Sequence, residues 1–253
     1  MTGAERRSVV DVIARVCRER SAQLLVGAST VEAVTALRRR SEVTAALSLV
    51  PLFLCPGEAA VVAHFTALAA ASPVPLVIYH VPYRTGQHLS VDAIRRIAEL
   101  VGMVGIKYAV GGIDTGTIEL LADPPADFAV LGGDDAFISP LLALGAHSGI
   151  LASAHLATAR FAELVDAWRG GTAAPARTLG HRLAVLSSAL FAEPNPTVIK
   201  AVLHAQGRIP TATVRLPLLP AGADTVQSAL RHFTAWVAHR RTALTAATAY
   251  PRA

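Results

Sequence analysis

Lys107 is the residue whose type and position most clearly indicate chemistry in this sequence. The chain has 23 basic residues, and Lys107 and Lys200 are its only lysines. Arginine can replace lysine as a surface cation, but it stays protonated and cannot act as an amine nucleophile. A lysine kept in such an arginine-rich chain is therefore a candidate nucleophile. Lys200 falls within a helical pattern, NPTVIKAVLHA, where a surface or packing role fits better.

Lys107 ends an apolar run, VGMVGIK, that is typical of a buried parallel strand. Apolar neighbours disfavour a charged ammonium group, so we expect its pKa to fall. A neutral amine can attack a ketone and form an imine. The alternative is a lysine that merely ends a strand and reaches solvent, and spacing alone leaves both roles open.

Tyr79 ends the preceding apolar run, PLVIY, and Arg84 lies in the loop that follows it. A phenol at a strand end can pass protons to and from an imine and its enolic carbon. An arginine can hold a carboxylate through two parallel hydrogen bonds. The alternatives are a tyrosine packed in the core, with its hydroxyl on a backbone partner, and a solvated arginine in a turn.

Gly132, Gly133, Asp134 and Asp135 follow the next apolar run. A glycine lets the backbone approach a ligand closely. The two aspartates would suit a metal, but no carboxylate or histidine has matching spacing, and capping of the next helix explains them better. The nine histidines are spread singly, and His80 and His155 are the two that lie near strand ends.

The elements that must position these residues alternate short apolar runs with longer periodic segments, which is typical of βα units around a parallel sheet. The predicted strands are Gln23–Gly27, Ala45–Val50, Pro75–Tyr79, Met103–Lys107, Phe128–Leu131 and His147–Leu151. The predicted helices are Glu5–Arg20, Val31–Arg40, Glu58–Ala71, Val91–Leu100, a short one after Gly133, Ala154–Arg169, Thr178–Phe191, Pro196–Gln206 and Thr225–Arg241. We therefore expect a partial (β/α) barrel carrying the active site in residues 1–170 and a helical region in residues 171–253. Six strands are two fewer than a closed barrel needs.

Composition excludes several classes of protein. Hydrophobic residues make up 53% of the chain and charged residues 16%, which is enough apolar material for a core and the opposite of a disordered composition. No uninterrupted apolar run is long enough to span a bilayer, and the start lacks the features of a secretory signal. Cys17 and Cys55 are too few for a disulfide framework or a zinc site. The arginines behind the net charge of +5 are scattered, which disfavours nucleic-acid binding. We expect a cytoplasmic protein without a membrane or nucleic-acid partner.

Several segments together resemble one enzyme family. IYHVPYRTG resembles the YNVPxRTG motif of the dihydrodipicolinate synthase and N-acetylneuraminate lyase family, VGIKYA its VGIKEA lysine strand and LGGDD its LSGDD loop. GAHSGILASAHL is similar to the GxxGxISxxAN segment. EPNPTVIKAVLHAQG and VRLPLLP resemble the C-terminal signature of the family. The segments occur in the family's order over nearly the whole chain.

The resemblance implies a (β/α)8 TIM barrel with extra C-terminal helices, assembled as a homo-tetramer or dimer. It implies a lyase of the class I aldolase type, with 4-hydroxy-tetrahydrodipicolinate synthase of lysine biosynthesis as the leading activity. Such an enzyme joins pyruvate to an aldehyde such as aspartate semialdehyde, with no metal and no cofactor beyond the covalent imine. By the same resemblance Lys107 forms the Schiff base, Tyr79 relays protons, Arg84 binds the second substrate's carboxylate, and Gly133 and Ile150 line the pocket with their backbones.

Two departures from the family pattern stand out. ERRSVV resembles the opening of the family's second helix, so the first strand, first helix and second strand, with the GTTGE motif, are expected to be missing. A start codon placed too far downstream explains this better than a real truncation, because an open apolar sheet edge aggregates. In the second departure, Pro51–Leu52–Phe53 replaces the family's PYY and lacks its tyrosine hydroxyl; a smaller one is His80 in place of the motif's asparagine.

These departures keep two alternatives open. One is a paralogous aldolase or dehydratase that acts on a sugar-derived 2-oxo acid. The other is a non-catalytic member that binds a small molecule.

Overall fold

The computed structural model describes residues 1–233, and the chain folds into two compact units. The first unit comprises Met1–Asp134 and Leu144–Ser148. The second comprises Asp135–Ala143 and the residues from Gly149 on. The division into residues 1–170 and 171–253 stays a prediction.

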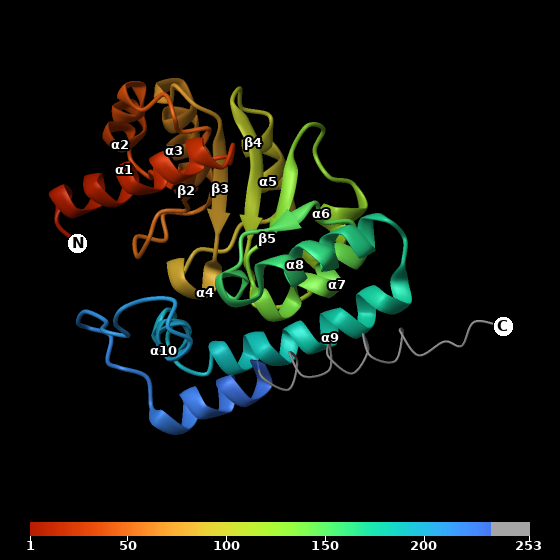
Figure 1. The fold of residues 1–253 in the computed structure, drawn as a ribbon. Helices are drawn as coiled ribbons and strands as arrows, with labels where there is room; N and C mark the ends of the chain where they lie inside the picture. The colour runs from red at the N-terminus through yellow and green to blue at the C-terminus, as the bar shows by residue number, and fades with distance from the viewer. Residues whose placement is uncertain (234–253) are drawn as a thin grey trace. The chain divides into compact units, whose positions relative to one another are not determined.

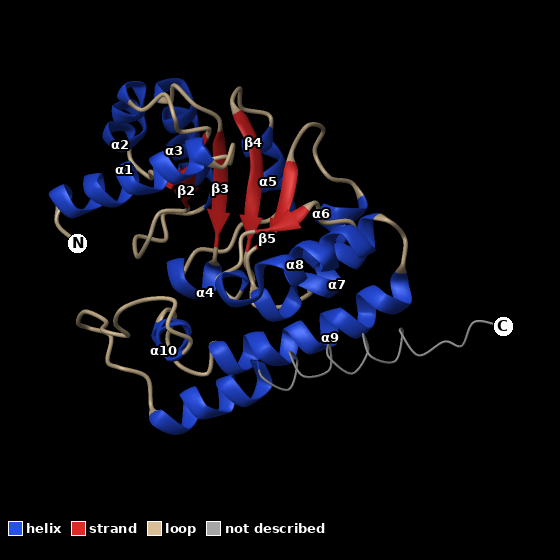
Figure 2. Cartoon of the chain, viewed as in Figure 1, coloured by secondary structure: helices blue, strands red, loops and turns tan. Residues whose placement is uncertain are grey.

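The strands form one sheet whose spatial order follows the order of the chain, from β1 to β6 (Figures 1 and 2). Each pairing between β1 and β5 is parallel. The strands are β1 (Leu25–Gly27), β2 (Ala45–Leu49), β3 (Leu76–His80), β4 (Met103–Tyr108), β5 (Ala129–Gly132) and β6 (Ser148–Gly149). All six predicted strands are present, although β1 and β6 are shorter than their apolar runs. The α/β class with a parallel sheet is confirmed, and the sheet has six strands rather than the eight of a closed barrel.

The helices alternate with the strands in the first unit and follow one another in the second. Their bounds are α1 (Gly3–Glu19), α2 (Val31–Ala36), η1 (Leu37–Arg39), α3 (Glu58–Ala71), α4 (Pro82–Thr85), α5 (Val91–Ala98), α6 (Thr115–Ala122), η2 (Asp135–Phe137), α7 (Ile138–Ala143), α8 (Ala154–Arg169), α9 (Ala173–Leu190) and α10 (Thr197–Ala205). Residues 223–233 are also helical. The remainder of the helix predicted over Thr225–Arg241 lies outside the described residues.

Two short helices were not predicted. α6 begins after Asp114, whose carboxylate accepts a hydrogen bond from the backbone N–H of Thr117 at 2.8 Å, while the Thr117 hydroxyl accepts one from the Asp114 N–H at 3.3 Å. This reciprocal capping stabilises a helix that contains a glycine in its first turn. α4 is a single turn with Pro82 at its first position and Gly86, at φ 76°, closing it.

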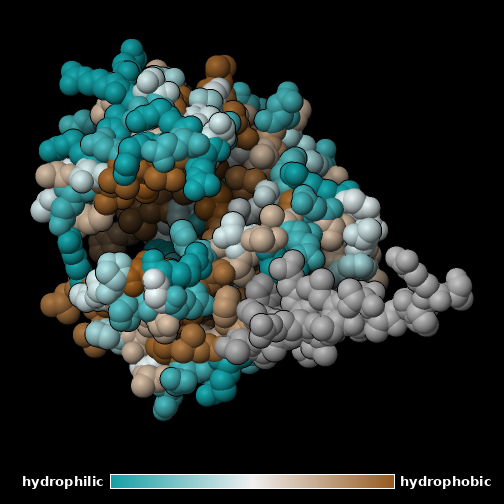
Figure 3. Space-filling view, in the orientation of Figure 1, coloured by the Kyte–Doolittle hydropathy of each residue, from teal (hydrophilic) through white to brown (hydrophobic). Residues whose placement is uncertain are grey.

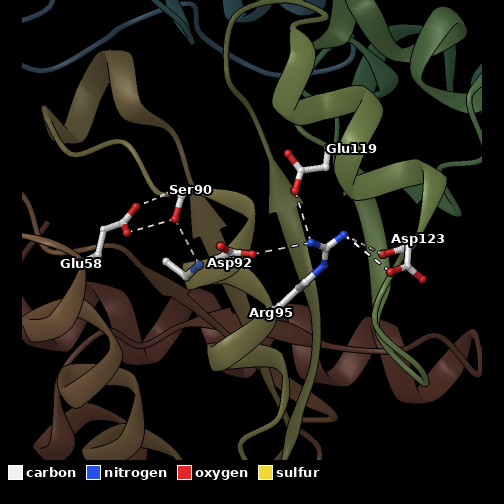
Figure 4. Close-up of polar contacts among 7 residues, drawn as sticks. Glu58, Ser90, Asp92, Arg95, Glu119 and Asp123 are labelled. Carbon is white, nitrogen blue, oxygen red and sulfur yellow. Dashed lines mark hydrogen bonds and ion pairs between the residues drawn. The ribbon is translucent and has the colours of Figure 1, made fainter.

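Polar contacts join the helices that cover β3 and β4 (Figure 4). Ser90, which caps α5, donates from its backbone N–H and its hydroxyl to the carboxylate of Glu58 at the start of α3. These hydrogen bonds hold the pKa of Glu58 below its ordinary value. Arg95 on α5 donates to Glu119 on α6 at 3.2 Å and lies 3.7 Å from the carboxylate of Asp123. Because the acidic partners are largely exposed, each ion pair contributes little alone, and the network serves mainly to align the helices.

The second unit has a core of its own, made by α7 to α10. Its most deeply buried side chains are Leu164, Leu183, Leu190, Val198 and Val202. Gly180 on α9 permits close packing, since a Cβ there would lie 2.0 Å from the Ser139 hydroxyl. The same hydroxyl accepts a hydrogen bond from the Trp168 indole at 3.0 Å.

Exposed large apolar side chains of the first unit include two groups. One is the helix face formed by Val9, Val12, Ile13 and Val16, and the other is the loop formed by residues 52–54. The face drawn in Figure 3 carries both hydrophilic and hydrophobic side chains. None of the helices in residues 1–233 combines the length and apolar character needed to cross a bilayer.

His80, at the end of β3, is fully buried. Its ring lies 5.4 Å from that of His88 and 5.9 Å from that of Tyr108, between centroids. Within residues 1–233 neither of its ring nitrogens has a hydrogen-bond partner. Burial lowers the pKa of His80 to about 4, the charge of His88 lowers it further, and the carboxylate of Asp114 opposes both. The folded protein therefore holds this imidazole neutral.

This burial predicts a stability that depends on pH. The unfolded chain protonates His80 below its ordinary pKa of 6.5, whereas the folded chain does so only near pH 4. The free energy of unfolding should therefore be largest above pH 6.5 and fall by about 3 kcal/mol towards pH 4. His80→Asn should remove most of this slope in chemical denaturation at a series of pH values. His155→Asn, at an exposed histidine, is the control and should keep it; equal slopes for wild type and His80→Asn would show that another group carries the dependence.

Candidate active site

Lys107 and Tyr79 lie side by side on neighbouring strands. They are paired in the register of β3 with β4, so both side chains project from the same face of the sheet. The Lys107 Nζ lies 4.2 Å from the centroid of the Tyr79 ring, and both residues are half-buried. The two groups that the sequence singled out for chemistry are thus in direct contact at the carboxyl ends of their strands.

The pairing depends on a shift of register within β3 and β4. Leu76 pairs with Met103, but the next residue, Val77, pairs with Gly105, so Val104 is an extra residue in β4. If the pairing continued in register from Leu76 and Met103, Tyr79 would lie opposite Ile106 and not Lys107. The irregularity therefore decides which side chain of β4 meets the phenol.

Gly133 follows β5 and lies against the Lys107 side chain. Its backbone N–H donates to the carbonyl of Tyr108 at 2.8 Å. A Cβ at this position would lie 2.7 Å from the Cβ of Ala109 and 3.0 Å from the Cε of Lys107. The absence of a side chain at position 133 therefore leaves the space that the lysine occupies.

Asp134 connects three loops at this edge of the sheet. Its Oδ1 accepts a hydrogen bond from the Tyr83 hydroxyl at 2.8 Å, and its Oδ2 accepts one from the Gly111 N–H at 2.7 Å. These partners lie after β3 and after β4, whereas Asp134 follows β5. The capping role that the sequence indicated does not describe Asp134. Asp135, which is buried, instead accepts a hydrogen bond from the backbone N–H of Ser153.

Arg84 lies on α4 with its side chain exposed. Its guanidinium carbon is 6.0 Å from the centroid of the Tyr83 ring. Among residues 1–233 no carboxylate forms an ion pair with it, although several other arginines are paired. Sequence analysis placed Arg84 at this edge but treated Tyr83 only as part of a turn. The sequence feature that could have pointed to Tyr83 is its hydroxyl, at the position that the YNVPxRTG motif leaves open.

The remaining candidates lie elsewhere. Ile150 is a half-buried residue of the second unit, and its role in the pocket stays a prediction. Lys200, on α10, donates from its Nζ to the carbonyl of Thr213, which fits the structural role expected for it. Phe53 is 93% exposed and has a φ of 68°, so its ring projects from the loop after β2 without a hydroxyl. In the described part of the chain no three His, Cys, Asp or Glu side chains are grouped as a metal site would require.

Comparison with known proteins identifies the family. The model of the dihydrodipicolinate synthetase family matches residues 1–235. The chain is 38% identical over 174 residues to 4-hydroxy-tetrahydrodipicolinate synthase 2 of Clostridium acetobutylicum, a match that covers 69% of this chain and 60% of that enzyme. It is 38% identical over 195 residues to the 4-hydroxy-tetrahydrodipicolinate synthase of Neisseria meningitidis, covering 76% and 66%. The chain thus spans less than two thirds of either enzyme's length.

A solved structure agrees with the sequence matches. The dihydrodipicolinate synthase of Acinetobacter baumannii in complex with pyruvate aligns with a TM-score of 0.85 and 30% identity, over 92% of this chain and 82% of that one. The likeness extends over both units of the described chain, so both the sequence and the fold identify the same group of proteins. The chain therefore belongs to the dihydrodipicolinate synthetase family.

Proposed function

We propose that this protein is a Schiff-base-forming lyase that joins pyruvate to an aldehyde, with the activity of a 4-hydroxy-tetrahydrodipicolinate synthase. The observation that carries the proposal is the contact between the Lys107 amine and the Tyr79 ring at the end of two paired strands. The names of the relatives and the pyruvate in the Acinetobacter baumannii structure support the same reaction.

The chemistry begins with the Lys107 amine. In its neutral form it attacks the C2 carbonyl of pyruvate, one proton is taken up, water leaves, and an iminium forms. Loss of a proton from C3 gives an enamine, whose C3 then bonds to the aldehyde carbon while the aldehyde oxygen takes up a proton. Water hydrolyses the new iminium and frees the lysine. Tyr79 would carry protons in these steps, and the contact of its ring with the amine supports this role.

Arg84 would bind the carboxylate of the aldehyde substrate. It is exposed at the same edge of the sheet and has no carboxylate partner among residues 1–233, so its charge is free for a ligand. A guanidinium offers a carboxylate two parallel hydrogen bonds. Aspartate semialdehyde carries such a group. We propose that the backbone of Gly133 lines the pocket, and the role of Ile150 stays a prediction; no metal or organic cofactor enters this scheme.

We also propose that the six strands are part of a (β/α)8 barrel. β1 ends the strand order, and α1 exposes an apolar face, both of which suit pairing with further elements. A homo-dimer or tetramer in the cytoplasm remains our expectation. One structural relative is described as a monomeric dihydrodipicolinate synthase variant.

The loop after β2 favours a second candidate activity. Phe53 offers no hydroxyl where the synthases carry a tyrosine. A paralogue that condenses or dehydrates a sugar-derived 2-oxo acid would tolerate that loss. Turnover with hydroxylated aldehydes, and none with aspartate semialdehyde, would favour this activity; a member that binds without catalysis would turn over neither.

The first prediction concerns the imine. Incubation with pyruvate and borohydride should add one reduced pyruvate to the protein, as measured by intact mass, because the imine becomes a stable secondary amine. Lys107→Ala should abolish the adduct and Lys107→Arg should not restore it. Lys200→Ala removes the only other lysine and is the matched control. An adduct that survives in Lys107→Ala, or none in the folded wild type, would sink the proposed function.

Tyr79→Phe separates proton transfer from imine formation. The ring would keep its contact with Lys107, so pyruvate binding should change little. Loss of the hydroxyl should slow the formation of the adduct and the condensation by about 10²-fold. The measurement is the rate of borohydride trapping together with kcat for condensation. Unchanged rates would assign the proton relay to another group.

Gly133→Ala should act on the lysine and also strain the local fold. The new methyl group would lie 2.7 Å from the Cβ of Ala109 and 3.0 Å from the Lys107 Cε, so both neighbours must move. We expect trapping by the folded variant to slow by about tenfold or more, and its melting temperature to fall. Gly112→Ala is the control, because a Cβ there meets nothing within 4 Å. Trapping at the wild-type rate in Gly133→Ala would contradict the contact described here.

A further inference from the structure

Tyr83 has contacts that the proposed reaction does not use. It occupies the position between Pro82 and Arg84, and its hydroxyl donates to Asp134 at 2.8 Å. Its ring also lies against the backbone of Gly111, where a Cβ would be 3.6 Å from the Tyr83 Cδ1. Tyr83 thus spans the loops after β3, β4 and β5, although more than half of its surface is exposed.

In the hydrogen bond between Tyr83 and Asp134, the tyrosine hydroxyl is the donor. Partial burial raises the pKa of Tyr83, and the hydrogen bond and the charge of Asp134 raise it further. The hydroxyl therefore stays protonated and can only donate to the carboxylate. The second oxygen of Asp134 is taken by the Gly111 N–H at 2.7 Å. Both carboxylate oxygens of Asp134 consequently have donors.

Arg84 is the cation beside this arrangement. Its guanidinium carbon lies 6.0 Å from the Tyr83 ring centroid, within the range of a cation–π contact. Arginine has many rotamers, and α4 is a helix of only 4 residues that gives it little support. Contact with the Tyr83 ring reduces the number of rotamers that the Arg84 side chain can adopt. The charges of Asp134 and Arg84 both act on the Tyr83 phenol, whose hydroxyl already occupies one oxygen of that carboxylate.

We propose that Tyr83 is a positioning residue that keeps Arg84 free and oriented for a carboxylate on the acceptor aldehyde. The site should consequently prefer an aldehyde that carries a carboxylate over a neutral one of the same length. This inference rests on the proposed function, since it needs Lys107 to form the enamine. It adds a residue that selects the second substrate and leaves the reaction with pyruvate unchanged.

The test compares succinic semialdehyde with butanal, in which a methyl group replaces the carboxylate. In Tyr83→Phe the ring remains, but Asp134 gains a free acceptor that can pair with Arg84. KM for succinic semialdehyde should rise about threefold to tenfold while kcat changes less than about twofold, and butanal should be unaffected. The double variant Tyr83→Phe/Asp134→Asn removes the competing charge and should recover much of the loss. A purely structural role for Tyr83 would not give this recovery.

Matched variants separate the possible failures. Tyr108→Phe removes a hydroxyl from the opposite face of β4 and should leave the preference intact. Arg84→Ala should abolish the preference. Should wild type trap pyruvate and yet show no preference for succinic semialdehyde, or should Tyr83→Phe keep the full preference, the inference is overturned while the proposed function stands. Absence of a pyruvate adduct in wild type would overturn both.

Discussion

The register between β3 and β4 is the constraint on which the rest of the site depends. It sets Tyr79 opposite Lys107, and the pairing exists because Val104 is inserted as an extra residue between Met103 and Gly105. Successive residues of a strand point to opposite faces, so a slip of one residue would move every side chain of the strand to the other face of the sheet. Tyr79 would then lose the lysine. Which reactive side chains meet on this face of the sheet therefore depends on how the backbones of β3 and β4 are aligned.

The two faces of β3 and β4 differ in burial and in the side chains that they carry. The face with Tyr79 and Lys107 is half-buried and carries the reactive groups. The other face carries His80 and Tyr108, which are buried and in ring contact. Burial of an imidazole without hydrogen-bond partners in the described chain is costly in acid. The buried apolar side chains of α3 and α5 belong to the core of the same unit.

The loops at the carboxyl ends of β3, β4 and β5 are joined through one carboxylate. Asp134 accepts hydrogen bonds from Tyr83 and Gly111, and the residue before it, Gly133, contacts Lys107. Asp134 and Gly133 are adjacent in the chain, so the residue that joins the loops directly follows the one that contacts the lysine. The family resemblance extends through these loops. This chain departs from the family pattern at Phe53 and His80, and it has a tyrosine at position 83, which the motif leaves open.

The sequence by itself determined the elements and the reactive residues. Continuous apolar runs predicted all six strands, because strands buried on both faces exclude polar side chains. The scarcity of lysine in the chain pointed to Lys107, and the order of the motifs along the chain indicated the family. Local patterns could not supply what depends on residues far apart in the chain: the extra residue in β4, the space that Gly133 leaves for Lys107, and the hydrogen bond from Tyr83 to Asp134, 51 residues away. α6 was missed for a related reason, since its reciprocal cap at Asp114 outweighs the glycine in its first turn. Periodicity records which side chains are buried, whereas the register between strands decides which of them meet.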